Sequence, residues 1–428
     1  MNFAQLKKPA AQYSLAIAVS ALMLNSAQAA TAEQKEVAQL RAEVAELKAL
    51  IKQQQQVQVQ QQADIQQVKT RPAPVVVAAA PASPLAGLKS KAGADVNLYG
   101  FVRGDANYII EGFDGDFGGV ASSTGTTKDK LRATAKTTRL GLDFSAPVGA
   151  DNKVGAKIEV DFAGAGDSES LRIRHAYLTY NNWLFGQTTS NFLSSHAPEM
   201  IDFSTNVGGG TTRVPQVRYN YKLAPQTQLF VSAEEGDSKT AVSGDIQYRV
   251  PNLTAKLTQG FADGKGSASA RALVENYKSK LADDTETAWG VAAGASYAVT
   301  DQLKLNGDLS YAEGNSNYLY GSNNAYVADG NSIEQNKFSA VQVGATYKFN
   351  EKLRSTLAYG ALFADDGSRF AELSPAQNEE VQQAWLNIIY APVKPVELGV
   401  EYVNGKRKTF AGDSYNDDRV GLMAKYSF

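Results

Sequence analysis

From about residue 94 to the C-terminus, apolar and polar residues alternate along the chain. In residues 139–144 (RLGLDF) and 157–162 (KIEVDF) every second side chain is apolar. Successive side chains of a strand point to opposite faces, so each segment predicts a strand with one apolar and one polar face. Sixteen such strands are predicted, near residues 96–105, 139–144, 157–162, 171–180, 183–187, 216–222, 228–234, 245–250, 253–260, 287–299, 302–312, 338–349, 352–363, 381–390, 396–403 and 419–428.

The predicted connections alternate in length. Short turns such as Asn181-Asn182 and Pro251-Asn252 alternate with long polar loops such as residues 188–212 and 262–286. This asymmetry is typical of a transmembrane barrel with short periplasmic turns and long extracellular loops, and a soluble β-sandwich does not need it. We therefore predict an all-β transmembrane barrel of about 16 antiparallel strands over residues 94–428, with both ends at the short-turn rim.

The N-terminal region has a different pattern. Lys7 and Lys8, an apolar segment at residues 14–24 and a small-residue site at residues 27–29 predict a signal peptide over residues 1–29. Apolar residues then recur with a period of seven, which predicts a coiled-coil helix over residues 30–70. Val or Ile at one core position and Leu at the other favour a dimer. A Pro- and Ala-rich linker over residues 71–93 would hold this coiled coil clear of the barrel, in the periplasm.

Composition excludes several classes of function. The 428 residues carry a net charge of −2, so nothing indicates a nucleic-acid partner. Past the N-terminus, the sequence has no run of 18 apolar residues, which excludes helical membrane spans but not a barrel surrounded by lipid. The final strand ends in Phe428, and its alternating aromatic end resembles the signal that the outer-membrane barrel-assembly machinery recognises. These features predict the outer membrane of a Gram-negative bacterium.

The polar face of the predicted barrel carries many basic side chains. Alternation places the following bases inward: Arg103, Arg139, Lys157, Arg172, Arg174 and Arg218. The long loop 188–212 is predicted to fold into the bore, and it contributes Glu199 and Asp202 to the constriction. Arginine binds carboxylates through a planar fork, and apolar walls focus the field of such a ring, so the pattern favours small anionic solutes. Inward acids such as Asp143 and Glu159 leave open an unselective pore in which the charges pair.

Two other functions, catalysis and a structural role, have different sequence requirements. The chain has two histidines, His175 and His196, and no phosphate-binding glycine loop, nucleophile elbow or metal-ligand cluster in its sequence. The sequence therefore predicts neither an enzyme nor a cofactor, and His175 is expected at a subunit contact. The second function is structural, with the coiled coil tethering the outer membrane to the cell wall.

Four segments carry a resemblance to a known family: LYGFVRGDANY at 98–108, TTRLGLDFSAP at 137–147, LRIRHAYLTY at 171–180 and GQTTSNF at 186–192. With the N-terminal coiled coil, they resemble the DcaP-like porins associated with dicarboxylate uptake. The resemblance implies a homotrimer of sixteen-stranded barrels in outer-membrane lipid, with the third loop folded inward. The implied trimer conflicts with the dimer that the heptads favour.

Overall fold

The computed structural model describes residues 88–164 and 169–428. The predicted signal peptide, the coiled coil and most of the linker lie outside the described residues. No helix in the described part of the chain is long and apolar enough to cross a membrane. The five-residue α2 (Arg369–Leu373) is the α-helix of this part, beside the short 3-10 turns η1 (Val120–Ser122) and η2 (Ala262–Gly264).

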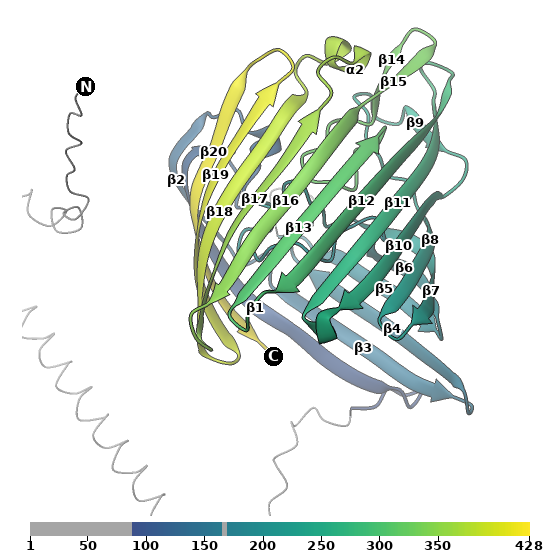
Figure 1. Cartoon of the computed structure of the whole chain (residues 1–428), viewed down its shortest axis with the longest axis vertical. Coiled ribbons are helices and arrows are strands. Elements are labelled where there is room, and N and C mark those ends of the chain that lie inside the picture. Colours follow the sequence, from purple (N-terminus) through teal and green to yellow (C-terminus); the bar gives the residue numbers. More distant parts are fainter. Residues whose placement is uncertain (1–87, 165–168) are drawn as a thin grey trace, which may run out of the picture. The chain divides into compact units, whose positions relative to one another are not determined.

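The described residues form a closed barrel of 16 antiparallel strands, as the alternation predicts (Figure 1). The barrel closes where β1 pairs with β20, in a register that runs from Phe101↔Ser427 to Glu111↔Asp418. The strands are β1 (Asp95–Gly112), β2 (Thr127–Thr134), β3 (Arg139–Val148), β4 (Asn152–Asp161), β5 (Arg172–Tyr180), β6 (Trp183–Thr189), β7 (Arg213–Ala224), β8 (Thr227–Glu234), β9 (Ile246–Tyr248), β10 (Asn252–Phe261), β11 (Gly266–Ser279), β12 (Thr285–Ala298), β13 (Leu303–Glu313), β16 (Lys337–Lys348), β17 (Leu353–Ala364), β18 (Asn378–Val393), β19 (Val396–Thr409) and β20 (Ser414–Ser427).

The wall contains 18 strand segments but 16 strands, because two of the strands are each interrupted and contribute two segments. β2 pairs with residues 105–112 of β1 and β3 pairs with residues 95–101, so β2 and β3 are the two halves of one strand. β9 and β10 likewise follow one another along β11. A separate hairpin, β14 (Tyr326–Asp329) with β15 (Ser332–Gln335), lies in a loop.

The sequence-based strand assignment is wrong around residues 245–286. The segments on either side of Pro251 were predicted as two strands joined by a turn, but they are β9 and β10 of one strand. Proline lacks the N–H that a continuous ladder needs, so it interrupts the strand without reversing it. The predicted loop 262–286 contains β11, whose outward side chains are largely alanine, so its alternation is weak. The two errors cancel in the strand total.

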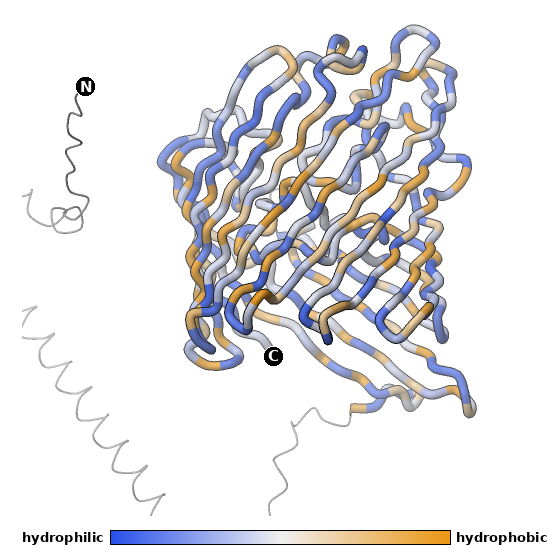
Figure 2. Tube along the Cα trace, in the orientation of Figure 1, coloured by the Kyte–Doolittle hydropathy of each residue, from blue (hydrophilic) through white to orange (hydrophobic). Residues whose placement is uncertain are grey.

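The wall is apolar outside and polar inside, and Figure 2 shows this alternation along the strands. Leu309 and Leu357 are more than 60% exposed on the outer surface, while the inward Arg271 and Glu401 are almost fully buried. This is the inverse of a soluble barrel, because hydrocarbon solvates the outside and water the bore.

Three loops pack together inside the barrel. They are the first loop (residues 113–126), the third loop (190–212) and the sixth loop (314–336). Val120, Phe192, Val207 and Leu319 from these loops form one buried cluster with wall residues that include Leu362. The sequence predicted one inward loop and missed the first and the sixth, because loops have no hydrophobic period.

Candidate pore constriction

The third loop is fixed to the wall opposite its own strands. The amides of Ile201 and Asp202 donate to the Glu401 carboxylate of β19 at 2.9 and 2.8 Å. Trp385 Nε1 and Asn387 Nδ2 of β18 donate to the Glu199 carbonyl at 3.0 and 3.1 Å. The loop starts at β6 and returns to β7, so these bonds show that it crosses the bore.

Further bonds hold the loop on both sides of this point. Ser194 Oγ donates to Asp308 of β13 at 2.6 Å, and Asn306 Nδ2 donates to the His196 carbonyl at 2.9 Å. Gln342 Nε2 of β16 donates to the Val207 carbonyl at 3.0 Å. Bonds to four wall strands leave the loop little freedom, so its lumen-facing edge is a fixed boundary of the pore.

The two acids predicted on this loop both have partners. Glu199 accepts from Arg354 of β17 at 2.7 Å, and Arg354 also binds Glu397 at 2.6 Å. Asp202 is only 2% exposed and accepts from the Gly118 amide of the first loop at 2.6 Å. Burial away from water raises the pKa of Asp202, because the charged form loses its hydration. Asp202 therefore joins two loops and lies beneath the surface of the bore.

Arg174 occupies a β-bulge. Val160 of β4 pairs with Ile173 and Glu159 with His175, which leaves Arg174 as the extra residue. Arg174 and His175 consequently both face the lumen, where His175 hydrogen-bonds Thr188 at 2.9 Å. The expectation that His175 lies at a subunit contact is wrong, because strict alternation fails at the bulge.

Three of the predicted arginines share two carboxylates. Arg174 binds Glu159 at 2.7 Å and Asp161 at 2.9 Å. Arg172 binds Asp161 through two nitrogens at 2.9 and 2.7 Å. Arg139 Nε lies 3.4 Å from Glu159. Three guanidinium groups against two carboxylates leave one net positive charge on this part of the wall.

Two other predicted bases are fully compensated. Arg103 binds Asp105 at 2.6 Å and also donates to the Ile201 carbonyl, with a side chain that is 3% exposed. Arg103 therefore holds the third loop against β1. Lys157 lies 3.2 Å from Asp143.

Arg218 differs from the other predicted bases. Within residues 88–164 and 169–428 it forms no ion pair, and its Nε is buried without a hydrogen-bond partner. Lys256 of β10 likewise has no ion pair among these residues, and Nε of Arg213 is also buried without a partner. Lys256 and Arg213 were not among the bases predicted from the sequence. The alternation of Leu253, Ala255 and Leu257 places Lys256 inward, whereas Arg213 directly follows the segment assigned to the loop.

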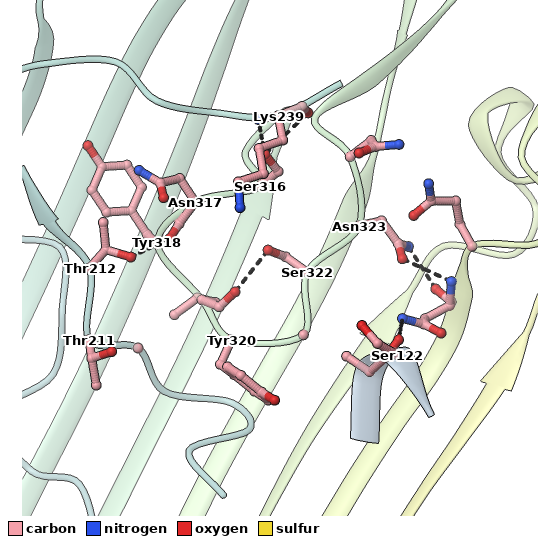
Figure 3. A pocket seen from close by; sticks show the side chains of 17 residues that line it. Ser122, Thr211, Thr212, Lys239, Ser316, Asn317, Tyr318, Tyr320, Ser322 and Asn323 are labelled. Carbon is pink, nitrogen blue, oxygen red and sulfur yellow. Dashed lines mark hydrogen bonds between the residues drawn. The ribbon is translucent and has the colours of Figure 1, made fainter. Parts of the chain in front are cut away.

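A polar cavity of about 450 Å³ lies between the loops that pack inside the barrel (Figure 3). Its wall is made mainly of hydroxyl and amide side chains from the first, third and sixth loops, with Gln377 and Asn378 at the start of β18 and one base, Lys239. The lining side chains labelled in Figure 3 are Ser122, Thr211, Thr212, Lys239, Ser316, Asn317, Tyr318, Tyr320, Ser322 and Asn323. The cavity therefore has one charged side chain, whereas the arginine cluster lies on the strands of the wall.

A closed barrel that is apolar outside and crossed by a fixed loop beside a charged wall defines an outer-membrane porin. Comparison with family models then identifies the family: the model described as DcaP outer membrane protein matches residues 23–428. The chain belongs to this family, which consists of membrane channels and not enzymes.

Solved structures agree with this assignment. The crystal structure of the outer membrane channel DcaP of Acinetobacter baumannii is 73% identical, with a TM-score of 0.79 over 80% of this chain and 100% of that chain. An anion-selective porin from Comamonas acidovorans is 14% identical, with a TM-score of 0.54 over 78% of this chain and 100% of that one. At that identity the similarity shows the fold alone. A comparison with curated protein sequences returned no significant match.

Proposed function

We propose that this porin allows passive diffusion of small hydrophilic solutes and favours anions such as dicarboxylates. The observation that carries the proposal is the excess of bases on the wall formed by β3 to β10. Arg139, Arg172 and Arg174 outnumber their two carboxylates, and Arg218 and Lys256 have no carboxylate partner among the described residues.

On the opposite side, the carboxylates that form no ion pair among the described residues, Glu401 and Asp202, are buried at the contact with the third loop and accept backbone amides. Arg354 and Lys425 are balanced by Glu199 and Glu397. Arg103 is balanced by Asp105. The field across the lumen therefore originates on one side, and apolar surroundings strengthen it. A guanidinium fork and an ammonium group near one another suit a solute that carries two carboxylates.

An unselective pore is the alternative, and the many ion pairs on both walls favour it. The two functions are separated by the reversal potential of the purified protein in a planar bilayer under a KCl gradient. We expect anion preference that falls severalfold in the variant R218Q/K256Q, which removes two charges without freeing a carboxylate. K222Q is the matched control, because Lys222 lies on β7 but is exposed near the short-turn rim. Cation preference in the unmodified protein, or no change in R218Q/K256Q, would refute the proposal.

The N-terminal segments and the oligomeric state are also part of the proposal. We infer an exported homotrimer with a periplasmic coiled coil that continues from the short-turn rim. The Phe428 amide donates to the Gly100 carbonyl at 3.1 Å, so the first and last strands of the barrel meet at the rim from which this segment would extend. Deleting residues 31–70 tests a tethering role, for which envelope integrity would be lost while solute uptake is retained.

A further inference from the structure

Phe230 is an aromatic side chain on an otherwise polar part of the lumen. It shares the inward face of β8 with Ser232 and Glu234, and its neighbours in the ladder are Asn220 and Lys256. It is half-buried and belongs to none of the hydrophobic clusters of the described residues. Packing within the protein therefore does not account for the ring.

Two cations flank the Phe230 ring. The Arg218 guanidinium carbon lies 5.7 Å from the ring centroid and Lys256 Nζ lies 5.8 Å from it. Both distances are within the range of a cation–π contact. Neither base has a carboxylate partner among the described residues, so both are available to an anion that reaches the ring.

Most other ring–cation contacts among the described residues lack this second property, and the exception, Arg407 at 4.6 Å from the Tyr415 ring, is bound to the Ser123 carbonyl and the Asn378 side chain. Phe101 lies 5.0 Å from Arg139 and 5.8 Å from Lys425, but those bases are paired with Glu159 and Glu397. Tyr99 lies 4.7 Å from Lys157, which is paired with Asp143. Phe230 is thus a ring flanked by two cations that form no ion pair among the described residues, since the nearby Glu234 carboxylate is buried and accepts hydrogen bonds from Ser232, Thr254 and Tyr318 instead.

We propose that Phe230, Arg218 and Lys256 form a binding site for carboxylates that carry an aromatic ring. The carboxylate would bind between the guanidinium and ammonium groups, and the solute's ring would pack against Phe230. Aromatic pairs prefer offset or edge-to-face arrangements, and such a contact adds to the charge attraction. This inference rests on the proposed anion preference, because a ring-bearing anion must first be admitted to the bore.

The test compares two monovalent anions of similar size, benzoate and cyclohexanecarboxylate. Each is added to the protein in a planar bilayer, and the concentration that halves the chloride current is measured. We expect this concentration to be about two- to tenfold lower for benzoate, the factor that one aromatic pair supplies. F230L should remove the difference and leave the reversal potential anion-selective, whereas F230Y and the control F101L should retain it.

The outcomes separate this site from the general anion preference. Equal half-blocking concentrations in an anion-selective unmodified protein would overturn the aromatic site alone. Retention of the benzoate preference in a folded F230L barrel, judged by its heat-dependent mobility on a gel, would also overturn it. A cation-selective reversal potential in the unmodified protein would overturn the proposed function instead.

Discussion

Replacing Arg172 and Arg174 with alanine reverses the local charge of the pore wall. The two arginines and Arg139 face Glu159 and Asp161 across β3, β4 and β5. In the R172A/R174A variant, Arg139 alone remains against both carboxylates. The local net charge then changes from one positive to one negative.

The size of the effect follows from Coulomb's law. A unit charge about 6 Å from a permeating ion contributes about 0.7 kcal/mol at the dielectric constant of water. Two charges give about 1.4 kcal/mol, or about tenfold in the permeability of an anion and, in the opposite direction, of a cation, so about a hundredfold in their ratio. Salt screens the effect over a Debye length of about 10 Å at 0.1 M, so the change should be larger in dilute electrolyte.

The assay is the reversal potential under a KCl gradient, recorded at two ionic strengths. K222Q again serves as the control, since it removes a lysine charge away from the ion-paired cluster. We expect the ratio of anion to cation permeability in R172A/R174A to fall by up to about a hundredfold and to fall further at low salt. An unchanged reversal potential in the folded double variant would show that permeating ions do not pass this wall, and would refute the assignment of selectivity to it.

Two further changes test the third loop. Gly208 has a φ of 79°, and a Cβ there would lie 2.1 Å from the Val341 carbonyl oxygen, so G208A should displace the loop from β16. Single-channel conductance should rise in G208A, and conductance equal to the unmodified protein would contradict the docked position. Burial lowers the pKa of His196 from its usual 6.5, so the imidazole is neutral above that pH and adds no charge to the bore. H196Q should therefore match the unmodified reversal potential from about pH 6.5 to 8, and a divergence within that range would show a charged imidazole.

Alternation along the sequence predicted the fold because a barrel wall is periodic. It placed Arg139, Arg172 and Arg218 inward, where the structure has them. It could not predict which bases are neutralised. Pairing depends on contacts such as Arg354 with Glu199, which are 155 positions apart in sequence. Such partners are set by strand register and by the course of a loop, and neither has a local signal.

The errors occurred where periodicity is broken. The bulge at Arg174 reversed the face of His175, and no single residue type announces a bulge of this kind. The inward packing of the first and sixth loops depends on Val120 and Leu319 meeting Phe192 in three dimensions. Isolated apolar residues in long loops do not show whether they face lipid, protein or water.

The packed loops in the bore also separate two kinds of evolutionary pressure. Phe192 and Val207 are fully buried inside the barrel, so antibodies and bacteriophage at the cell surface cannot reach these positions. Loop tips such as Asp365 and Asp366, by contrast, are exposed to the exterior. Selection at the cell surface can therefore change the outermost residues, while passage of solutes through the pore constrains a different set. An outer surface that varies between strains is compatible with an unchanged permeability.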